Sequence, residues 1–317
     1  MTATTLTAPL LLANDMLTGA EWSPAQVKQL LRLTADIKAH PARYAATLRG
    51  KFFALIFEKP SLRTRVTFEV GIQSMGGATV FLDHTQAARL GEREAVVDVA
   101  RNLERWVHGI IARVYDQTVL EELAANARIP VINALSDRFH PCQALADYFT
   151  LEEKFGALRG FRLAYVGDGN NVCHSLILLG ARLGAHLRIA TPANYAPAAE
   201  IIADAKRVAR ETRAKIELLN DPREAVAGAQ AVYTDSWTSM GFEAETAVRE
   251  NVFAPFQVNR EMMALAAPDA VFMHCLPAHR GHEVTAEVLD SARSIALDQS
   301  ENRMYSQKAI LETLLGG

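Results

Sequence analysis

Short apolar runs alternate with longer amphipathic stretches along most of the chain, and polar, glycine- or proline-containing turns separate them. Short apolar runs of this kind are typical of buried strands, and the amphipathic stretches are typical of helices that cover a sheet. The pattern predicts strands at residues 52–57, 78–82, 110–115, 130–135, 161–166, 186–190, 215–219, 231–233 and 270–273. It predicts helices at residues 24–39, 62–75, 92–107, 119–127, 140–155, 172–183, 197–212 and 302–315.

Strands that alternate with helices indicate a parallel sheet with helices on both faces. The alternation stops near Gly156 and Gly160 and then starts again. We therefore expect an α/β protein with two doubly wound, Rossmann-like domains of similar size. In such sheets ligands bind beyond the carboxyl ends of the strands, so the active site should lie in the cleft between the domains.

Composition and charge narrow the class of ligand. The chain has 317 residues, of which 50% are hydrophobic and 22% charged, with a net charge of -3. This balance gives no general attraction to nucleic acid or to an acidic membrane, so an anion has to be captured locally and should be small. Residues 1–22 carry no secretory signal, and no stretch could span a bilayer. Three cysteines without paired spacing favour a reducing compartment, and we expect the cytoplasm.

One stretch, residues 57–65, breaks a local rule. Ser61 can cap the helix at 62–75, in which Val66, Val70 and Ile72 are expected to be buried. Arg63 and Arg65 then fall in the first turn, where the helix dipole disfavours cations. A phosphate bound by the free amides and by the Ser61, Thr64 and Arg63 side chains would resolve the conflict. The alternative is a pair of surface arginines that pair with carboxylates.

Polar side chains also follow the other strands of the first half. Arg113 closes the strand at 110–115, and His140 and Gln143 follow the strand at 130–135. Gln86 lies in a polar loop, and Arg303 is expected at the start of the last helix. A single histidine at a helix start is more often a cap than a catalyst, so only the convergence of these groups indicates a site.

In the second half, residues 167–171 follow a strand and open a helix, as in dinucleotide-binding proteins. The fingerprint lacks its third glycine and the acidic residue that would hold a ribose, which argues against a nicotinamide cofactor. Asn171 remains an amide that could bind a substrate carboxylate. Asp235 opens a loop that reaches Gly241 and could close over a ligand.

The segment 274–282 contains one cysteine and three histidines, which raises the question of zinc. Its spacing matches no ordinary structural zinc site, so we expect no metal. Cys275 would need an activating base to act as a nucleophile, and the sequence cannot identify one.

Together these motifs resemble the aspartate/ornithine carbamoyltransferase family, and within it the ornithine enzymes, from about residue 30 to residue 315. The run Ser61-Leu62-Arg63-Thr64-Arg65 is similar to the family motif Ser-Thr-Arg-Thr-Arg, with Leu62 in place of the usual threonine. The other matching motifs are His-Pro-Cys-Gln at 140–143, Gly-Asn-Asn at 169–171, Asp-x-x-x-Ser-Met-Gly at 235–241, His-Cys-Leu-Pro at 274–277 and Arg303.

The resemblance implies carbamoyl transfer from carbamoyl phosphate to the side-chain amine of L-ornithine, which gives L-citrulline and phosphate without a cofactor or a covalent intermediate. It implies catalytic roles for Arg113, His140 and Cys275, the last by position rather than by attack. The carbamoyl-phosphate contacts implied are Ser61, Leu62, Arg63, Thr64, Gln86, Arg113, His140, Gln143, Cys275, Leu276 and Arg303. The ornithine contacts implied are Asn171, Asp235, Ser239 and Met240.

The resemblance also implies an organisation. Residues 1–150, with the helix 302–317 packed back on them, would bind carbamoyl phosphate, and residues 151–301 would bind ornithine. Gln86 would reach a neighbouring subunit's site, which implies a homotrimer or a multiple of trimers. Putrescine, acetylornithine or aspartate stay open as alternative acceptors, although the 239–241 loop favours ornithine. Two alternatives from other functional classes stay open: an oxidoreductase and an inactive anion-binding subunit.

Overall fold

The computed structural model describes residues 14–84, 89–238 and 243–316. Gln86, Ser239 and Met240 therefore lie outside the described residues. The first half contains α1 (Pro24–Ala39), η1 (Pro41–Tyr44), β1 (Phe52–Phe57), α2 (Leu62–Ser74), β2 (Ala78–Asp83), α3 (Val96–Leu103), β3 (Gly109–Arg113), α4 (Gln117–Asn126), β4 (Val131–Leu135) and α5 (Pro141–Phe155).

The second half follows with more helices than the sequence pattern predicts. Its elements are β5 (Arg162–Val166), α6 (Asn171–Leu183), β6 (His186–Ala190), η2 (Ala193–Tyr195), α7 (Ala199–Thr212), β7 (Lys215–Leu219), α8 (Pro222–Val226), β8 (Ala231–Thr234), η3 (Glu243–Glu245), α9 (Thr246–Phe253), η4 (Ala254–Phe256), α10 (Arg260–Met263), β9 (Val271–His274), α11 (Ala286–Leu289) and α12 (Ala296–Leu315).

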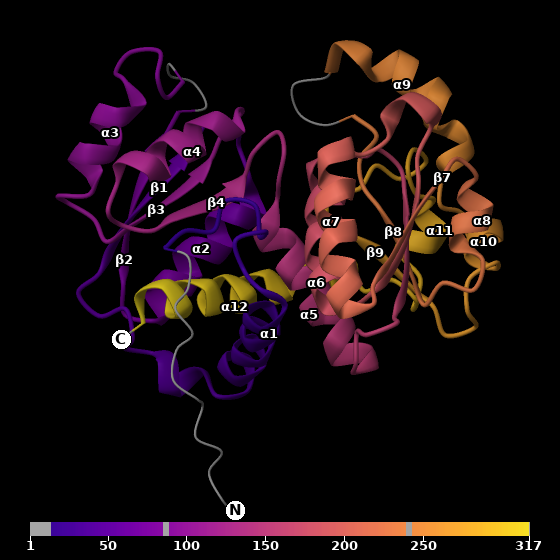
Figure 1. Ribbon diagram of the computed structural model, residues 1–317, viewed down its shortest axis with the longest axis horizontal. Coiled ribbons are helices and arrows are strands. Elements are labelled where there is room, and N and C mark those ends of the chain that lie inside the picture. Colours follow the sequence, from indigo (N-terminus) through magenta and orange to yellow (C-terminus); the bar gives the residue numbers. More distant parts are fainter. Residues whose placement is uncertain (1–13, 85–88, 239–242, 317) are drawn as a thin grey trace, which may run out of the picture.

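Within the described residues the strands form two parallel sheets, which confirms the predicted α/β class (Figure 1). The first sheet has the order β2-β1-β3-β4 and the second has the order β7-β6-β5-β8-β9. Strand order reverses between β1 and β3 in one sheet and between β5 and β8 in the other. Each sheet thus has one switch point at which loops diverge and leave a crevice at the carboxyl ends of the strands.

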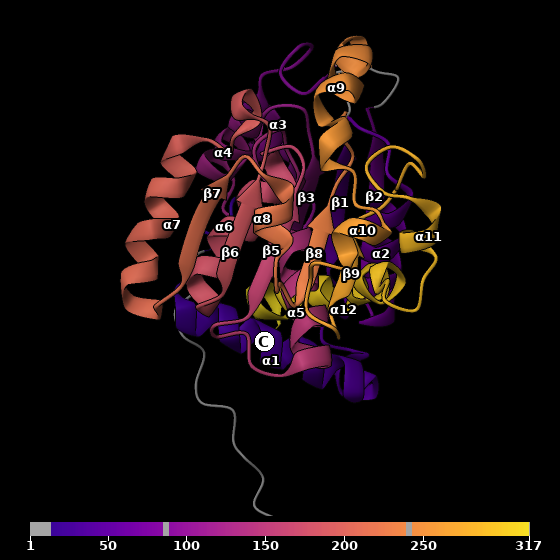
Figure 2. The same cartoon turned by 90° about the vertical axis from the view of Figure 1, so that its right-hand side faces the viewer.

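Side chains of each strand alternate between two cores, as the period of two requires. Phe53, Leu55 and Phe57 of β1 pack with α1, α2, α5 and α12, whereas Ala54 and Ile56 pack with α3 and α4. The core on the first of these faces is continuous with the α6 and α7 face of the second sheet. A shared helical layer therefore joins the two halves, with α5 and α6 next to each other at its centre (Figures 1 and 2).

The last helix returns to the first half of the chain. α12 packs against α5, α1 and α2 and runs beneath the first sheet (Figure 1). It begins at Ala296 rather than near residue 302, so the prediction that Arg303 starts the helix is wrong, and Arg303 lies two turns inside it. Among the described helices none is long and apolar enough to cross a membrane.

Other differences from the predicted elements have local causes. The helix predicted at 92–107 is confined to Val96–Leu103, because turns occupy both of its flanks. Pro197 was expected at the first position of its helix, but α7 starts after it, at Ala199. The short helices α8 to α11 were missed, since elements of four to eight residues carry too little periodicity to detect.

The outer face of α2 also differs from the prediction. Ile72 is buried, but Val66 and Val70 are 47% and 46% exposed because α2 turns Phe68 and Ile72 toward the core instead. Together with Leu62, which is 75% exposed, they form an apolar stripe at helical spacing along the solvent face of α2. We call Leu62, Val66 and Val70 the α2 stripe.

Candidate active site

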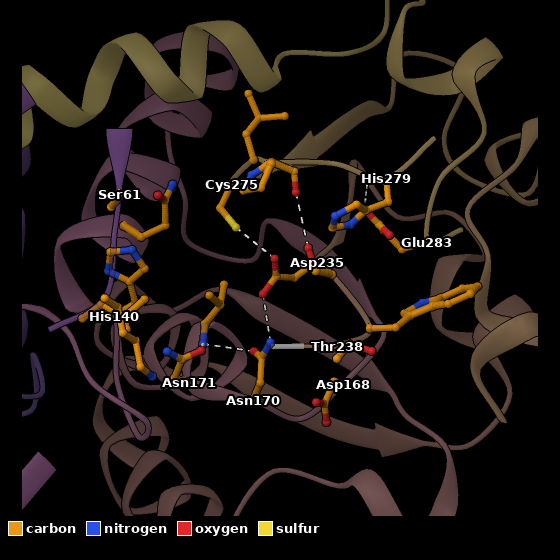
Figure 3. Close-up of a pocket in the computed structure, with 18 of the residues that line it drawn as sticks. Ser61, His140, Asp168, Asn170, Asn171, Asp235, Thr238, Cys275, His279 and Glu283 are labelled. Atoms are coloured by element: carbon orange, nitrogen blue, oxygen red, sulfur yellow. Dashed lines mark hydrogen bonds and ion pairs between the residues drawn. The ribbon is translucent and has the colours of Figure 1, made fainter. Parts of the chain in front are cut away.

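A cleft of about 850 Å³ lies between the two halves, and both switch points open into it. On one side it is lined by residues that follow β1, β3 and β4, among them Ser61 and His140. On the other side it is lined by residues that follow β5, β8 and β9, among them Asn170, Asp235 and Cys275. Figure 3 shows Ser61 and His140 across the cleft from Asp235 and Asn170. The two sheets thus build one site together.

The start of α2 forms the floor of the first side. Ser61 has extended backbone geometry and its Oγ accepts a hydrogen bond from the Thr64 amide at 3.3 Å, which confirms the predicted N-cap. Thr64 Oγ1 accepts from Ser61 Oγ at 3.0 Å and from Arg303 Nη2 at 2.6 Å. When Ser61 is the donor of this hydroxyl pair, the Thr64 hydrogen can be directed to another acceptor, such as a ligand oxygen.

Four cations line this side of the cleft: Lys59, Arg63, Arg113 and Arg303. We call them the cationic wall. Arg113 and Arg303 are 4% and 3% exposed, and none of the three arginines forms an ion pair with a carboxylate of the described residues. Burial and the neighbouring guanidiniums Arg303 and Arg63 lower the pKa of Arg113 to about 9. Burying like charges without a counterion costs folding free energy. This arrangement therefore favours the binding of an anion at the cationic wall.

Arg65, the other arginine of the first turn, points elsewhere. Its Nε lies 3.3 Å from Glu69 Oε1, and its guanidinium lies 3.7 Å from the centre of the Phe81 ring. The hypothesis of a surface arginine paired with a carboxylate is therefore right for Arg65. Arg63 instead lines the cleft.

Several buried polar atoms beside the cationic wall have no hydrogen-bond partner within the described part of the chain. They are Arg113 Nε, His140 Nδ1, Gln143 Oε1 and Arg303 Nε. Folded proteins rarely leave such atoms unpaired, and a group of them around one cleft indicates a ligand with both donors and acceptors. Burial, with Arg303 and Arg113 nearby, lowers the pKa of His140 well below its ordinary value, so this ring is a neutral imidazole.

The opposite side of the cleft centres on a carboxylate. Asp235 follows β8 and is 9% exposed; its Oδ2 accepts from Asn170 Nδ2 at 2.8 Å and its Oδ1 accepts from Cys275 Sγ at 3.1 Å (Figure 3). Of the other acids that line this side, Asp168 is paired with Arg249 at 2.7 Å, Glu283 lies 3.2 Å from His274, and Glu250 lies 3.3 Å from His282. Since no ion pair of Asp235 is found among the described residues, Asp235 is the carboxylate able to receive an ammonium group.

Cys275 is a hydrogen-bond donor rather than a nucleophile. Burial, reinforced by the charge of Asp235, raises the pKa of its thiol well above the usual range. The thiol stays protonated near neutral pH and cannot attack as a thiolate.

One group of possible metal ligands occurs in the described residues, formed by Asp235, His274 and Cys275. Both nitrogens of His274 are already engaged, Nδ1 with the Leu276 amide at 2.8 Å and Nε2 with Glu283 at 3.2 Å. The group therefore does not offer the free imidazole lone pair that a transition metal requires.

The glycine-rich turn after β5 packs against the chain itself. A Cβ at Gly169 would lie 2.3 Å from the Pro197 nitrogen, and the Gly169 amide donates to the Tyr195 carbonyl at 2.9 Å. The glycine thus permits a close approach of residues 195–197. It does not make room for a pyrophosphate, and this weakens the nicotinamide reading further.

The structure brings most of the predicted site residues to the cleft: Ser61, Leu62, Arg63, Thr64, Arg113, His140, Gln143, Asn171, Asp235, Cys275, Leu276 and Arg303. Leu62 lies at the rim. Asn171 donates from Nδ2 to the Ser136 carbonyl at 2.7 Å and so ties the two sides of the cleft together. Leu276 has a φ of 60°, in the left-handed region, and its amide is held by His274.

Sequence reasoning missed several residues of the site. Lys59 is 5% exposed and lines the cleft; burial, with Arg113 beside it, lowers its pKa to about 8. Asn170 holds Asp235, and Trp237 lines the same pocket. Lys59 and Asn170 could have been predicted, because they lie within residues 57–65 and 167–171, the motifs that follow β1 and β5.

Two family models together match most of the chain. Residues 14–153 match "Aspartate/ornithine carbamoyltransferase, carbamoyl-P binding domain", and residues 159–314 match "Aspartate/ornithine carbamoyltransferase, Asp/Orn binding domain".

Two proteins with similar sequences are named as ornithine carbamoyltransferases. An "Ornithine carbamoyltransferase" of Thermococcus kodakarensis is 52% identical over 270 residues, which cover 85% of this chain and 85% of the relative. An "Ornithine carbamoyltransferase, anabolic" of Pyrococcus furiosus is 47% identical, with 97% and 96% covered.

Solved structures of ornithine carbamoyltransferases are also similar to this chain. The ornithine carbamoyltransferase structure from Pyrococcus furiosus has a TM-score of 0.93 at 47% identity, covering 97% of this chain and 98% of that one. The structure from Thermus thermophilus has a TM-score of 0.87 at 46% identity, covering 96% and 99%.

Proposed function

The chain belongs to the aspartate/ornithine carbamoyltransferase family, and we propose, from this membership and the two sides of its cleft, how it carries out the ornithine reaction. It is an ornithine carbamoyltransferase: it transfers the carbamoyl group of carbamoyl phosphate to the side-chain amine of L-ornithine. The observation that supports this assignment best is the cleft itself. Within the described residues, the three arginines of the cationic wall form no ion pair, and they face Asp235, which forms none either.

The phosphate is assigned to the start of α2. The free amides of the first turn, the Ser61 and Thr64 hydroxyls, and the guanidiniums of Arg63 and Arg303 would surround its oxygens. Thr64 is suited to this role because its hydroxyl accepts from Ser61 and Arg303 and so has its hydrogen free to donate.

The carbamoyl group is assigned to the deeper part of the cationic wall. Arg113 and the neutral ring of His140 would donate to its carbonyl oxygen, while the unpaired Gln143 Oε1 would accept from its amino group. Residues Cys275 and Leu276, held by His274, would complete this pocket from the opposite side. Gln86 is assigned by the sequence motif alone.

The chemistry needs no covalent intermediate. The uncharged amine of ornithine attacks the carbamoyl carbon, the bond from that carbon to the phosphate oxygen breaks, and the amine proton leaves with phosphate. Negative charge develops on the carbonyl oxygen and on the leaving phosphate, where the donors of Arg113, His140 and Arg303 are already in place. Fixed donors of this kind stabilise the transition state without reorganising.

Ornithine is assigned to the other side of the cleft. Asp235 would pair with the α-ammonium, held in position by Asn170 and the Cys275 thiol. Asn171 is assigned to the α-carboxylate, for which its amide would exchange its present bond to Ser136. Ser239 and Met240 are assigned on the sequence motif alone.

We also propose the organisation implied by the motifs. Residues 1–150 with 302–317 would form the carbamoyl-phosphate half and residues 151–301 the ornithine half. We propose a homotrimer on the resemblance at Gln86 alone; the α2 stripe, an exposed apolar row, supports contact with a second copy that would cover it. Three free cysteines among the described residues support a reducing compartment such as the cytoplasm.

The trimer and its shared site can be tested together. One variant altered at Gln86 and one altered at Arg113 should each be inactive. Mixed under subunit exchange, they should regain part of the activity, because hybrid trimers contain sites with neither change. No recovery despite verified exchange would contradict a shared site.

The substrate assignment can be tested by steady-state rates of phosphate release with ornithine, acetylornithine and putrescine. Putrescine lacks both α-groups and acetylornithine lacks the α-ammonium. Loss of a partner for a buried charge typically costs several kcal/mol, so kcat/KM should favour ornithine by roughly a hundredfold or more. Equal values for ornithine and putrescine would overturn the proposed role of Asp235.

A further inference from the structure

The orientation of the Gln143 amide decides what the cleft offers to the carbamoyl group. Gln143 is fully buried on the first turn of α5, and its Nε2 donates to Asp147 Oδ1 at 2.8 Å. Its Oε1 has no partner in the described chain. The two ends of an amide have nearly the same shape, so their direction has to be set by the groups around them.

The orientation of the Gln143 amide follows from a backbone N–H, which can only donate a hydrogen bond. The His274 amide of β9 donates to Gln299 Oε1 at 3.0 Å, which leaves Gln299 Nε2 as a donor. Gln299 Nε2 donates to Asp147 Oδ1 at 2.6 Å, so this oxygen is an acceptor. Gln143 can then face Asp147 only with its Nε2, and its Oε1 is left for the cleft.

The same direction holds for both protonation states of Asp147. Burial raises the pKa of this carboxyl to about 7. A proton would reside on Oδ2, beside the Tyr233 hydroxyl at 3.1 Å, and that hydroxyl can accept as well as donate. With the proton on Oδ2, Oδ1 carries no hydrogen and still accepts from Gln299, whose Nε2 also donates to the Tyr233 hydroxyl at 3.1 Å.

We infer that Asp147 is a positioning residue that holds Gln143 with Oε1 toward the amino group of carbamoyl phosphate, and that the bond direction is transmitted from His274 through Gln299. This inference rests on the proposed function. It assigns to Asp147, which does not line the cleft, the selectivity for NH₂ over CH₃ at the transferred group. Acetyl phosphate carries CH₃ at that position and has no hydrogen bond to offer Gln143.

The test compares dissociation constants for carbamoyl phosphate, acetyl phosphate and inorganic phosphate by calorimetry. In Asp147→Leu, which is close in size but has no acceptor, Gln143 is free to turn its NH₂ toward the cleft. We expect carbamoyl phosphate to bind about tenfold more weakly and acetyl phosphate and inorganic phosphate to be unchanged. Asp147→Ala gives the same comparison should leucine fail to fold.

Two variants serve as matched controls. In Asp147→Asn, Oδ1 can still accept from both glutamines while Nδ2 donates to the Tyr233 hydroxyl, so the preference for carbamoyl over acetyl phosphate should persist. Thr150→Val removes a buried hydroxyl one turn further along α5, where it contacts Asn302 of α12 at 3.0 Å, without touching Asp147. The preference should persist there too.

A rescue provides a sharper readout. Glutamate at position 143 presents an oxygen to the cleft whichever way it turns, so Gln143→Glu combined with Asp147→Leu should restore the preference. Its added charge weakens both acyl phosphates alike and cancels in their ratio.

The outcomes separate this inference from the proposed function. Equal weakening of all three ligands in Asp147→Leu, or loss of the preference in Asp147→Asn, would mean that Asp147 acts through packing or charge, and the inference would be wrong. If the unaltered protein binds acetyl phosphate as tightly as carbamoyl phosphate, the assignment of the carbamoyl pocket fails instead.

Discussion

The two sheets present ligand groups from the same topological position but with opposite charge. Beyond the switch point between β1 and β3 the chain places Arg63 and Arg113, and beyond the one between β5 and β8 it places Asn170 and Asp235. The parallel-sheet topology thus fixes where ligands bind in both halves. The residues that follow each strand set the charge of each side, and we propose that the first side receives an anion and the second an ammonium group.

The two sides of the cleft also differ in how their charged groups are paired. Arg63, Arg113 and Arg303 repel one another without a counterion in the described chain, whereas Asp235 is held by the neutral donors Asn170 and Cys275. The arginines of the first side therefore repel one another until an anion binds, whereas the carboxylate of the second side already has two hydrogen-bond donors.

The largest effect is expected from breaking the cationic wall. Arg113→Met should lower kcat/KM by about 10²–10³-fold, because it removes a fixed donor to the carbonyl oxygen. It should also remove part of the repulsion, so the melting temperature of the phosphate-free protein should stay equal or rise by ~2 °C or more. Kinetics and calorimetric melting measure the two effects. Lower stability with retained activity would mean that Arg113 is structural.

Breaking the opposite side should have a smaller and more selective effect. Asp235→Asn should lower kcat/KM for ornithine by about a hundredfold and abolish the preference over putrescine, because the α-ammonium loses its partner. Binding of carbamoyl phosphate, measured by calorimetry, should change by less than about twofold, since Asp235 pairs with none of the cationic wall's side chains. Equal loss of both substrates would contradict the division of the cleft.

Lys59 gives the cationic wall a pH dependence near neutrality. Its pKa is lowered to about 8, so the cation is lost as pH rises through that value, and anion binding weakens. The dissociation constant for carbamoyl phosphate should rise by about three- to fourfold between pH 7 and 8.5 if the charged form alone binds. In Lys59→Arg, which keeps its charge, the rise should be much smaller, since of the lowered pKa values of Lys59 and Arg113 only that of Arg113, about 9, then remains. A parent and a variant with the same pH profile would exclude Lys59 from the site.

The smallest effect is expected at Arg65, the matched control within the same motif. Arg65→Gln should change kcat/KM by less than about twofold, because this guanidinium pairs with Glu69 and covers Phe81. The stability loss should stay near ~1 kcal/mol or below by urea unfolding. A large loss of activity would show that both arginines of the turn serve the ligand.

Most strands could be predicted from the sequence because they are short apolar runs bounded by turns. β1 has the predicted bounds at both ends, and Ser61 caps α2 as its side chain suggested. Local patterns of this kind are set by neighbours in the sequence.

The predictions that were wrong or missing concern contacts between residues far apart in the sequence. Val66 and Val70 fit a helical apolar pattern, yet the burial of α2 is decided by where α12 packs. Asp147 could not be found at all, since its partners Tyr233 and Gln299 come from elements 86 and 152 residues away. Arg65 could not be separated from Arg63, because both lie in the first turn of α2 and the sequence does not show which guanidinium faces the cleft.

The return of α12 to the first half has a consequence for how the protein is made. Arg303 shares a cleft with Ser61 and Arg113, but it leaves the ribosome long after them. At elongation rates of about 5–20 residues per second, the segment between Arg113 and Arg303 takes roughly 10–40 s to synthesise. During that interval the nascent chain has strands and helices of the first half but no complete set of phosphate ligands. A chain that ends before α12 therefore lacks Arg303 and should have little activity.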